Sequence, residues 1–405
     1  MRDIDLFQQA LGLTPPWRVK ECKFDPDGKR LDLYLDFPRG GTFECPECGQ
    51  SDCKAYDTQE KTWRHLNFFE HQTYLHARLP RVQCPVCGIK TVTVPWARSG
   101  SGFTLLFEAF VMALVKEMPV KAAARQVGEQ DTRIWRILNH YVEQARDQAD
   151  FSGVTHVGID ETSSRKRHNY ISVFVDLAES RVLYATEGRS ATAVAGFKQD
   201  LIQHGGSSDR IEDFCLDMWP AYIKGIREHF PKSQMTFDKF HIQKMLNGAV
   251  DEVRRKEQKD NPDLKHTRYL WLTNPEKLRA DERALLQTLT PRNRHLKTSR
   301  AYAIKQAFQE FWELPEELAE PFLKKWYFWA THSRLPAMID VARTIKNHWD
   351  GVLRWFKSRI NNGVLEGINS LIQAAKARAR GYRTTRNLIT IVYLIMGKLR
   401  FALPT

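Results

Sequence analysis

The feature that most constrains the fold is a run of strand signals that begins near residue 153 and places an acidic residue at a strand end. THVGIDET, at 155–162, reads as a short apolar strand that ends on Asp160. NYISVFVDL and RVLYATEG follow it with only short turns between them. Three strands in such close succession predict an antiparallel meander.

A helix and a fourth strand complete this order. TAVAGFKQDLIQHG predicts an amphipathic helix, and IEDFCLDMW predicts a strand that ends on Asp217. The order strand, strand, strand, helix, strand is the RNase H-like arrangement, in which strands one and four are neighbours. Asp160 and Asp217 are therefore expected side by side. Two adjacent carboxylates repel each other unless they share a proton or bind cations, and a pair of Mg²⁺ ions is suited to phosphoryl transfer.

A third carboxylate is expected on a helix near the C-terminus, within NNGVLEGINSLIQAAKARARGYR. Glu366, Asn369, Gln373 and Lys376 share one helix face at spacings of 3, 4 and 3, and the opposite face, which includes Leu371, is apolar. Glu366 would thus point from a docked helix toward whatever the polar face meets. Each acid alone could be an ordinary solvated or capping carboxylate, so the combination carries the prediction of a catalytic Asp160, Asp217 and Glu366.

Two further strand-end acids compete with these. Asp176 ends the second strand, which runs opposite to the first, so its end is expected away from the site. Asp238 ends SQMTFD, and His241 follows three residues later. This pair could position DNA or support a metal ligand, or it could equally be a helix cap beside a satisfied histidine.

The basic excess of the chain predicts a polyanionic partner. Lys plus Arg number 61 against 48 Asp plus Glu, a formal charge of +13. Such an excess favours nucleic acid, although a merely basic soluble protein has the same composition. A strip without acids follows the Glu366 helix and suits a phosphate backbone. The candidate DNA contacts in this half of the chain are Arg165, Lys166, Arg167, Asn369, Lys376, Arg378, Arg380 and Arg383.

Four of the seven cysteines form two matched pairs, CPEC at Cys45 and Cys48 and CPVC at Cys84 and Cys87. Two such knuckles complete a tetrahedral zinc site, and the 35 residues between them leave room for strands. A redox pair is the alternative reading. Cys53 is a possible fifth, competing thiol.

Residues 104–145 read as three helices joined by short turns. Gly128 ends the second helix, and Asp131 or Thr132 caps a third that carries Arg133 and Arg136 on its polar face. A short helix, a glycine turn and a basic second helix form the DNA-reading helix-turn-helix. A plain helical bundle would show the same pattern.

The fold class expected is multidomain α+β. We predict an N-terminal zinc-binding domain at 1–98, a helix-turn-helix domain at 99–150, and an RNase H-like α/β catalytic core at 151–248. An all-α insertion at 249–355 interrupts this core, which closes with helices at 356–405. The insertion concentrates aromatic residues at 326–329, which could stack on unpaired bases but more often fill a helical core.

No apolar run reaches the length of about 18 residues that a membrane span needs, and the N-terminus does not read as a signal peptide. The longest apolar stretch, LITIVYLIMG at 388–397, is better read as a core helix. We therefore expect no membrane partner and a cytoplasmic location, where paired cysteines bind metal rather than form disulfides.

Taken together, the chain resembles bacterial insertion-sequence DDE transposases, most closely the ISL3 group. The residues that carry the resemblance are CPEC and CPVC, the helix-turn-helix, HVGIDETSSRKRHNYISVFVDL, FCLDMWPAYIKGI, FDKFHIQKMLN and NNGVLEGINSLIQAAKARARGYR. The resemblance implies that Asp160, Asp217 and Glu366 bind two Mg²⁺ ions. It also implies that the family's Asp-x-x-His element falls on Asp238 and His241.

The resemblance further implies an activity and partners. Water would cut the element's end and release a 3′-hydroxyl, which would then attack target DNA. The zinc module and helix-turn-helix would read the terminal inverted repeats, and a homodimer on DNA, associated with the nucleoid, is the expected working form. The alternatives are a non-catalytic DNA-binding regulator, or a structure-specific nuclease that cuts without joining.

Overall fold

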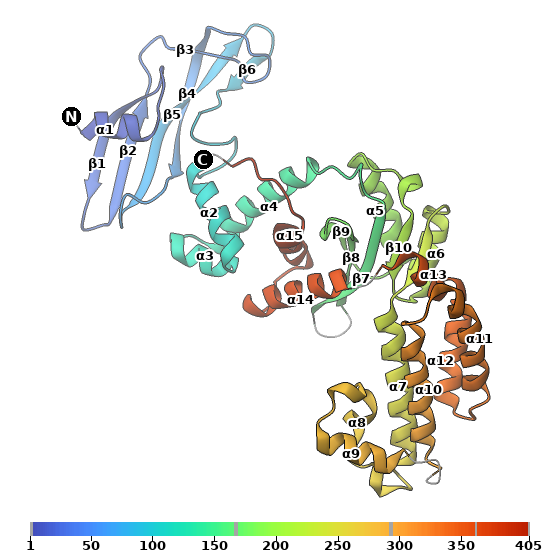
Figure 1. Cartoon of the computed structure of the whole chain (residues 1–405). Coiled ribbons are helices and arrows are strands. Elements are labelled where there is room, and N and C mark those ends of the chain that lie inside the picture. The colour runs from blue at the N-terminus through green and yellow to red at the C-terminus, as the bar shows by residue number, and fades with distance from the viewer. Residues whose placement is uncertain (1–2, 166–168, 291–294, 361–362, 404–405) are drawn as a thin grey trace. The chain divides into compact units, whose positions relative to one another are not determined.

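The computed structural model describes residues 3–165, 169–290, 295–360 and 363–403 (Figure 1). The chain forms two compact units, one of Met1–Ala145 with Arg400–Thr405 and the other of Arg146–Leu399. Lys166 and Arg167, which the sequence suggests as DNA contacts, lie outside the described residues. No helix in the described part of the chain is long and apolar enough to cross a membrane.

The first unit begins with a twisted sheet in the order β1-β2-β5-β4-β3, with β6 paired to β5. Alternation in β2 places Leu31, Leu33 and Leu35 in the core, where they share a cluster with Trp63 and Trp96. The short helix α1 precedes the sheet. The elements are α1 (Asp3–Ala10), β1 (Arg18–Asp25), β2 (Arg30–Asp36), β3 (Thr42–Phe43), β4 (Cys53–Arg64), β5 (Gln72–Cys84) and β6 (Gly88–Thr91).

Three helices follow in the first unit: α2 (Leu105–Glu117), α3 (Val120–Val127) and α4 (Asp131–Asp147). The Thr104 hydroxyl caps α2 by accepting from the Phe107 N–H. Gly128 ends α3 with φ of 71°, a left-handed conformation that a glycine adopts without cost. The predicted succession of three helices is confirmed, with helix ends within a residue or two of those expected.

The second unit contains a five-stranded sheet in the order β11-β10-β7-β8-β9. Its strands are β7 (His156–Arg165), β8 (Asn169–Asp176), β9 (Arg181–Glu187), β10 (Asp213–Leu216) and β11 (Gln234–Phe237). The first three pair antiparallel, whereas β10 runs parallel to both β7 and β11. The first and fourth strands are therefore neighbours, and the RNase H-like prediction is confirmed.

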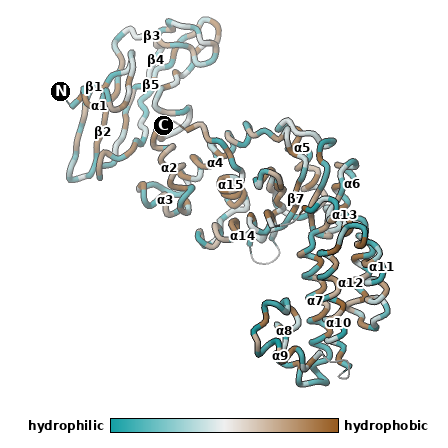
Figure 2. The backbone as a smooth tube through the Cα atoms, viewed as in Figure 1, coloured by the Kyte–Doolittle hydropathy of each residue, from teal (hydrophilic) through white to brown (hydrophobic). Residues whose placement is uncertain are grey.

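Helices cover both faces of this sheet. Phe197 of α5 (Ala191–Gln203) stacks on Phe174, which pairs across the strands with Ile159. On the opposite face, α14 (Gly363–Arg378) bonds to the alternate residues of β7. Helices α6 (Pro220–His229) and α15 (Thr385–Met396) complete the two layers. Most of α15 is coloured hydrophobic in Figure 2, in keeping with its predicted place in the core.

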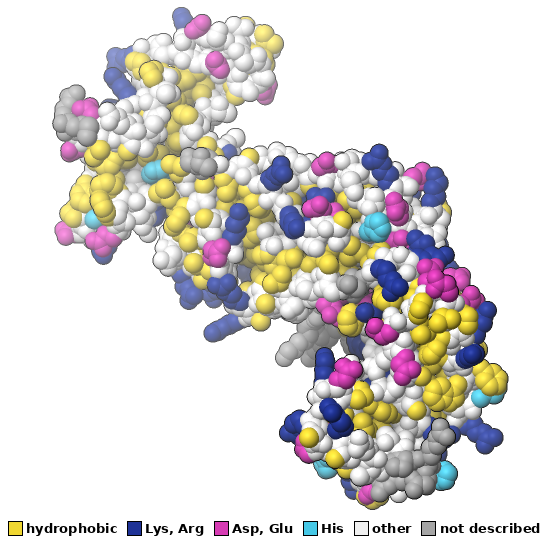
Figure 3. Space-filling view, in the orientation of Figure 1, with side chains coloured by type: hydrophobic (Ala, Val, Ile, Leu, Met, Phe, Trp, Pro, Cys, Tyr) yellow, Lys and Arg dark blue, Asp and Glu magenta, His cyan; other side chains and the backbone are white. Residues whose placement is uncertain are grey.

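The long helix α7 leads directly from the sheet into an all-helical insertion. Among its aromatic residues, Trp326 is buried and donates to the Ile304 carbonyl, whereas Phe328 and Trp329 are exposed. Figure 3 shows hydrophobic side chains gathered over this part of the chain. The helices are α7 (Lys239–Glu257), α8 (Arg268–Leu272), α9 (Ala280–Leu289), α10 (Lys297–Phe311), α11 (Glu316–Thr331), α12 (Pro336–Asn347) and α13 (Trp349–Ser358). Short 3₁₀ turns lie at Ser208–Arg210, Pro262–Leu264 and Pro275–Lys277.

One expectation for α14 is wrong. The spacing predicts Leu371 on the apolar face, but its side chain is 53% exposed. Leu365, Ile368 and Ile372 alone make the buried stripe. The stripe is narrower than the periodicity indicates, and α14 meets the sheet through β7, its central strand.

Candidate active site

Three aspartates lie in one row on three neighbouring parallel strands, Asp160 within β7 and Asp217 and Asp238 directly after β10 and β11. The prediction that the first strand ends on Asp160 is wrong, because β7 continues to Arg165 and pairs with β8 over that length. Cys215 pairs with Gly158, two residues before Asp217 and Asp160 respectively. Leu216 pairs with Phe237, one residue before Asp217 and Asp238. When the two pairings are extended along the strands, Asp160, Asp217 and Asp238 stand opposite one another. Because side chains alternate along a strand, residues that stand opposite one another project from the same face of the sheet.

Burial raises the pKa of the Asp160 carboxyl to about 6, and the charges of Asp217 and Asp238 add to this effect. Two donors hold the side chain. The Glu161 N–H donates to Oδ1 at 2.7 Å, and the Asn369 side chain donates to Oδ2 at 2.6 Å. A carboxylate that is fixed in place, shielded from water and surrounded by like charge favours a cation in its neighbourhood.

Two basic side chains, His241 and Arg189, act electrostatically on Asp217. Burial raises the pKa of the Asp217 carboxyl, and the charge of Asp238 adds to this increase. The charges of His241 and Arg189 act in the opposite direction and lower the pKa. The Trp219 N–H donates to Asp217 Oδ1 at 3.0 Å and fixes the turn after β10.

The Asp238–His241 pair is formed at the start of α7. Asp238 caps this helix by accepting from the Phe240 N–H at 3.0 Å, and its Oδ2 lies 3.2 Å from His241 Nδ1. The bond to Asp238 raises the pKa of His241. The helix cap that the sequence suggests at Asp238 is present, whereas a role of the pair in positioning DNA or supporting a metal ligand stays a prediction.

The polar face predicted on α14 lies along β7. Gln373 donates to the Thr162 hydroxyl at 2.6 Å, and Lys376 donates to the Ser163 carbonyl at 2.6 Å. With Asn369 on Asp160, three of its four members bond to this strand. The fourth, Glu366, is exposed in the first turn, and within the described residues no hydrogen bond or ion pair joins it to Asp160 or Asp217.

The donor set fits a divalent ion with oxygen ligands. Asp160 and Asp217 supply carboxylate oxygens, which are the ligands that Mg²⁺ and similar hard cations take. Glu366 lies one helical turn before Asn369, so their Cβ atoms are separated by about 5–6 Å. The sheet thus brings Asp160 and Asp217 together, and Glu366 lies one helical turn from Asn369, which donates to Asp160.

Two residues that the sequence reasoning missed adjoin this site. Glu161 is largely buried on the opposite face of β7, and Arg189 Nη1 lies 3.5 Å from its Oε2. Burial raises the pKa of Glu161, and the Asp217 charge adds to this. A lone arginine in a turn carries no sequence signal, although the acid directly after Asp160 could have been noticed.

The other predicted DNA contacts lie in varied surroundings. Arg133 bonds Glu129 at 2.5 Å and lies over the Phe103 ring, whereas Arg136 is exposed. Arg165 donates to the Arg383 carbonyl. Arg378, Arg380 and Arg383 are exposed at the end of α14 and after it.

The four knuckle cysteines converge in the first unit. The sulfur atoms of Cys45, Cys48, Cys84 and Cys87 all lie within 4.8 Å of one another, the one such cluster of candidate ligands among the described residues. The Cys87 N–H holds the pKa of the Cys84 thiol near 6, which favours the thiolate that zinc binds. Cys53 is buried outside this set and donates to the Gln50 carbonyl. The cluster therefore fits structural zinc.

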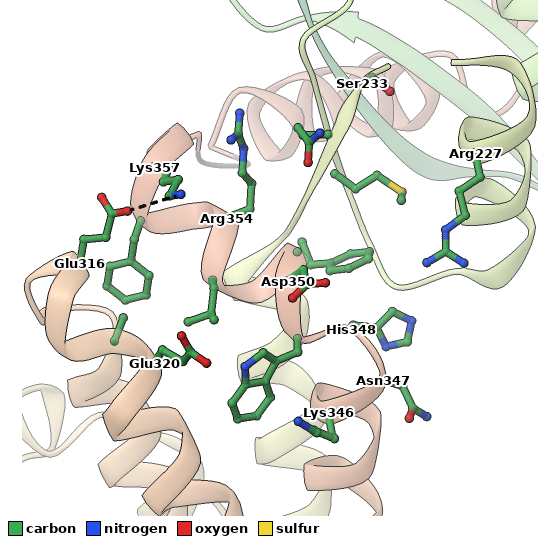
Figure 4. A pocket seen from close by; sticks show the side chains of 18 residues that line it. Arg227, Ser233, Glu316, Glu320, Lys346, Asn347, His348, Asp350, Arg354 and Lys357 are labelled. Atoms are coloured by element: carbon green, nitrogen blue, oxygen red, sulfur yellow. Dashed lines mark ion pairs between the residues drawn. The ribbon is translucent and has the colours of Figure 1, made fainter. Parts of the chain in front are cut away.

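A separate cavity of about 630 Å³ lies along the outer edge of β11, between that strand and α11–α13 (Figure 4). Arg227, Lys346 and His348 line one end, and Glu316 lies 3.9 Å from Lys357 at the other. None of the three aspartates lines it. The cavity is therefore separate from the carboxylate row.

An RNase H-like sheet with a row of aspartates across its parallel strands, preceded by a zinc cluster and a helix-turn-helix, defines the class of DNA-processing phosphoryl transferases. Residues 157–392 match the transposase family with the ISL3-type DDE domain. The chain belongs to this family, and so is a DDE transposase, an enzyme that cuts DNA and transfers its strands. Residues 92–142 match the helix-turn-helix domain of transposase family ISL3, and residues 42–87 match the zinc-finger of transposase IS204/IS1001/IS1096/IS1165.

Two curated relatives extend the similarity over the full chain. The transposase for insertion sequence element IS1557 from Mycobacterium tuberculosis is 26% identical, over 100% of this chain and 98% of its own. The transposase for insertion sequence element IS1001 from Bordetella parapertussis is 27% identical, over 93% of this chain and 94% of its own. The helix-turn-helix implies DNA binding, and the DDE core implies a divalent metal.

Proposed function

We propose that Asp160, Asp217 and Glu366 hold two Mg²⁺ ions and catalyse cleavage and strand transfer at the ends of an insertion sequence. Water displaces the 3′-oxygen of the scissile phosphodiester. The 3′-hydroxyl released then attacks a phosphodiester of target DNA and displaces the 3′-oxygen of the target strand. Both steps are in-line displacements at phosphorus, so no covalent bond to the protein is required.

The observation that carries this proposal is the alignment of Asp160 with Asp217, with α14 docked beside them. The Asn369 bond to Asp160 ties the helix to the first aspartate. Glu366 is one turn away on the same face, so a small movement of its exposed side chain would bring its carboxylate to the pair.

The chain's own groups prepare this chemistry. Asn369 and the Glu161 N–H orient the Asp160 carboxylate, and the Trp219 N–H orients Asp217. The bound ions would lower the pKa of the attacking water or hydroxyl and stabilise the leaving oxygen.

Asp238 is the other acid in the row, and we propose an accessory role for it. One of its oxygens caps α7 and the other faces His241. The charge of His241 lowers the pKa of Asp217, whereas the charge of Asp238 raises it. Because both oxygens of Asp238 already have partners, we assign Glu366, rather than Asp238, as the third metal ligand.

The decisive experiment is Glu366→Gln in a strand-transfer assay on end DNA with Mg²⁺. We expect joined products to fall by more than about 10²-fold, as for removal of one stabilising group at an active site. Glu317→Gln is the matched control, because Glu317 is also an exposed glutamate in the first turn of a helix. Strand transfer at the wild-type rate by the Glu366 variant would refute the assignment, and nicks without joined products from the wild type would indicate a nuclease.

We propose that the N-terminal domains at 1–98 and 99–150 read the terminal inverted repeats, with Arg133 and Arg136 on α4 facing the DNA. Arg165, Arg378, Arg380 and Arg383 would follow the phosphate backbone near the catalytic core. Two ends must be joined to one target, so we expect a homodimer when end DNA is bound. Sedimentation of the chain with and without this DNA tests the dimer.

A further inference from the structure

Arg189 is held by contacts that fix both its backbone and its head group. It lies in the turn between β9 and α5. Its guanidinium is 4.4 Å from the Trp219 ring centroid and 5.0 Å from that of Tyr170. The Trp219 indole N–H donates to the Arg189 carbonyl at 3.1 Å, and Nη1 lies 3.5 Å from Glu161 Oε2.

The residues that hold Arg189 are linked directly to the two central aspartates. Glu161 follows Asp160 in β7, and Trp219 donates its backbone N–H to Asp217 Oδ1. The charge of Arg189 also acts on Asp217. Arg189 is therefore a cation at the margin of the carboxylate row, oriented by the same turn that orients Asp217.

An ordinary surface ion pair does not account for this arrangement. An ion pair between exposed side chains contributes at most about 1 kcal/mol to stability. Such a pair does not need aromatic rings or a hydrogen-bonded turn to hold the arginine in place. Here the carboxylate partner is only 14% exposed, while the arginine is 41% exposed. Two rings lie near a guanidinium that makes one contact of 3.5 Å to Glu161, and its exposure leaves part of it open to a ligand from solvent.

We propose that Arg189 is a phosphate-binding residue of the catalytic site, contacting non-bridging oxygens of the DNA phosphodiester at or next to the scissile bond. Glu161, Trp219 and Tyr170 are its positioning residues. The inference rests on the proposed function, since it takes Asp160 and Asp217 as the place of cleavage.

Charge and geometry both require such a group. The acids gather negative charge where a DNA phosphate must approach, and a cation beside them offsets part of that repulsion. Arginine presents a planar fork of donors that matches phosphate oxygens, and it stacks on aromatic rings as a lysine does not.

The test compares the wild type with Arg189→Ala on DNA duplexes in which a single phosphate has lost its charge. The probes are duplexes with the terminal inverted repeat of the element that encodes this chain, each with one neutral methylphosphonate at or beside the scissile position. Affinity is measured in Ca²⁺ and cleavage in Mg²⁺. Arg210→Ala is the control, because Arg210 is an exposed arginine before β10 in the same unit.

With the wild type, one methylphosphonate position should lower affinity by about 10-fold, the effect of removing a charge-assisted hydrogen bond. Arg189→Ala should bind the unmodified duplex about 10-fold more weakly and be insensitive to the methylphosphonate at that position alone, while Arg210→Ala stays sensitive to it. Cleavage by Arg189→Ala should fall by about 10²-fold, with partial recovery in Arg189→Lys, which keeps the charge without the fork.

Undiminished methylphosphonate sensitivity of Arg189→Ala at every position would overturn the phosphate contact, and so would cleavage within about 2-fold of the wild type. Failure of the proposed function is a separate result. If Asp160→Asn cleaves at the wild-type rate, the carboxylate site is wrong, and the affinity measurements in Ca²⁺ still decide whether Arg189 binds a phosphate.

Discussion

At the scale of single residues, the site is a set of charges that the fold holds against their mutual repulsion. Asp160 is nearly enclosed, bonded by Asn369 and close to Asp217 and Asp238. His241 and Arg189 offset only part of this negative charge. The repulsion among these carboxylates therefore lowers the stability of the folded chain, and a bound cation would relieve it.

Asp160→Asn should make the protein more stable at neutral pH and inactive. The folded-state pKa of Asp160 is about 6, against 3.8 for an ordinary aspartate, so the folded chain binds this proton more tightly than the unfolded chain does. The free energy of unfolding must then fall as the pH rises from about 4 to 6 and stay lower above that range. Asparagine carries no such charge, so the variant should gain roughly 1–3 kcal/mol at pH 7.5 and nothing at pH 4.

Thermal unfolding at both pH values measures this difference, and Asp176→Asn is its control. Asp176 is also a buried aspartate of the five-stranded sheet, but it accepts from two backbone N–H groups and pairs with Arg181. Removing its charge should destabilise the chain at pH 7.5. Added Mg²⁺ should raise the melting temperature of the wild type and leave that of Asp160→Asn unchanged; a similar rise in both would count against Asp160 as a ligand.

At the scale of elements, the site depends on how closely α14 approaches β7. A Cβ at Gly158 would lie 2.8 Å from side-chain methyl groups of Leu365 and of Leu177, so a larger residue requires these side chains to shift. This approach places Asn369 on Asp160 and Gln373 on Thr162. One glycine thus sets the position of the helix that carries Glu366.

Gly158→Val should lift α14 from the strand. Overpacking of this kind costs about 1–3 kcal/mol, and displacement of Asn369 and Glu366 should reduce cleavage in addition. Adding Leu365→Ala to this variant should restore part of both the stability and the cleavage, because it removes the atoms that clash. Gly153→Val is the control, since a Cβ there meets nothing within 4 Å. Wild-type cleavage by a folded Gly158→Val would show that the site tolerates a displaced helix.

The elements also show what the sequence could and could not predict. The strand order and the polar face of α14 follow from local periodicity, because alternation and helical spacing are properties of neighbouring residues. The exposure of Leu371 could not be foreseen, since it depends on how much of the sheet the helix covers. The Arg189 cluster was missed for the same reason: Tyr170, Trp219 and Glu161 come from three different parts of the chain and meet only when it folds.

At the scale of the whole molecule, the chain divides the tasks of a transposase between two compact units. The first holds the zinc cluster and the helix-turn-helix, and the second holds the carboxylate row and the basic end of α14. The excess of positive charge lies almost wholly in the second unit, which has 41 Lys plus Arg against 30 Asp plus Glu, whereas the first has 20 against 18. A unit that reads sequence and a unit that cuts any phosphodiester should use their basic residues differently. Base contacts confer specificity, whereas phosphate contacts confer affinity alone.

Variants in the two units should therefore separate specificity from affinity. Arg136→Ala should lower the preference for the inverted repeat over an unrelated duplex by about 10- to 100-fold, the value of one base contact. The double change Arg378→Ala, Arg380→Ala should weaken binding of both duplexes equally. It should also flatten the slope of log K against log salt by up to about 1.8, which is about 0.9 for each phosphate that the variant no longer neutralises. Arg343→Ala is the control, an exposed arginine of α12 that lies outside the basic strip. Titrations of labelled duplexes at several salt concentrations measure both quantities. A reduced preference in the double variant, or an unchanged preference in Arg136→Ala, would contradict this division, because the unit that cuts would then also read the repeat.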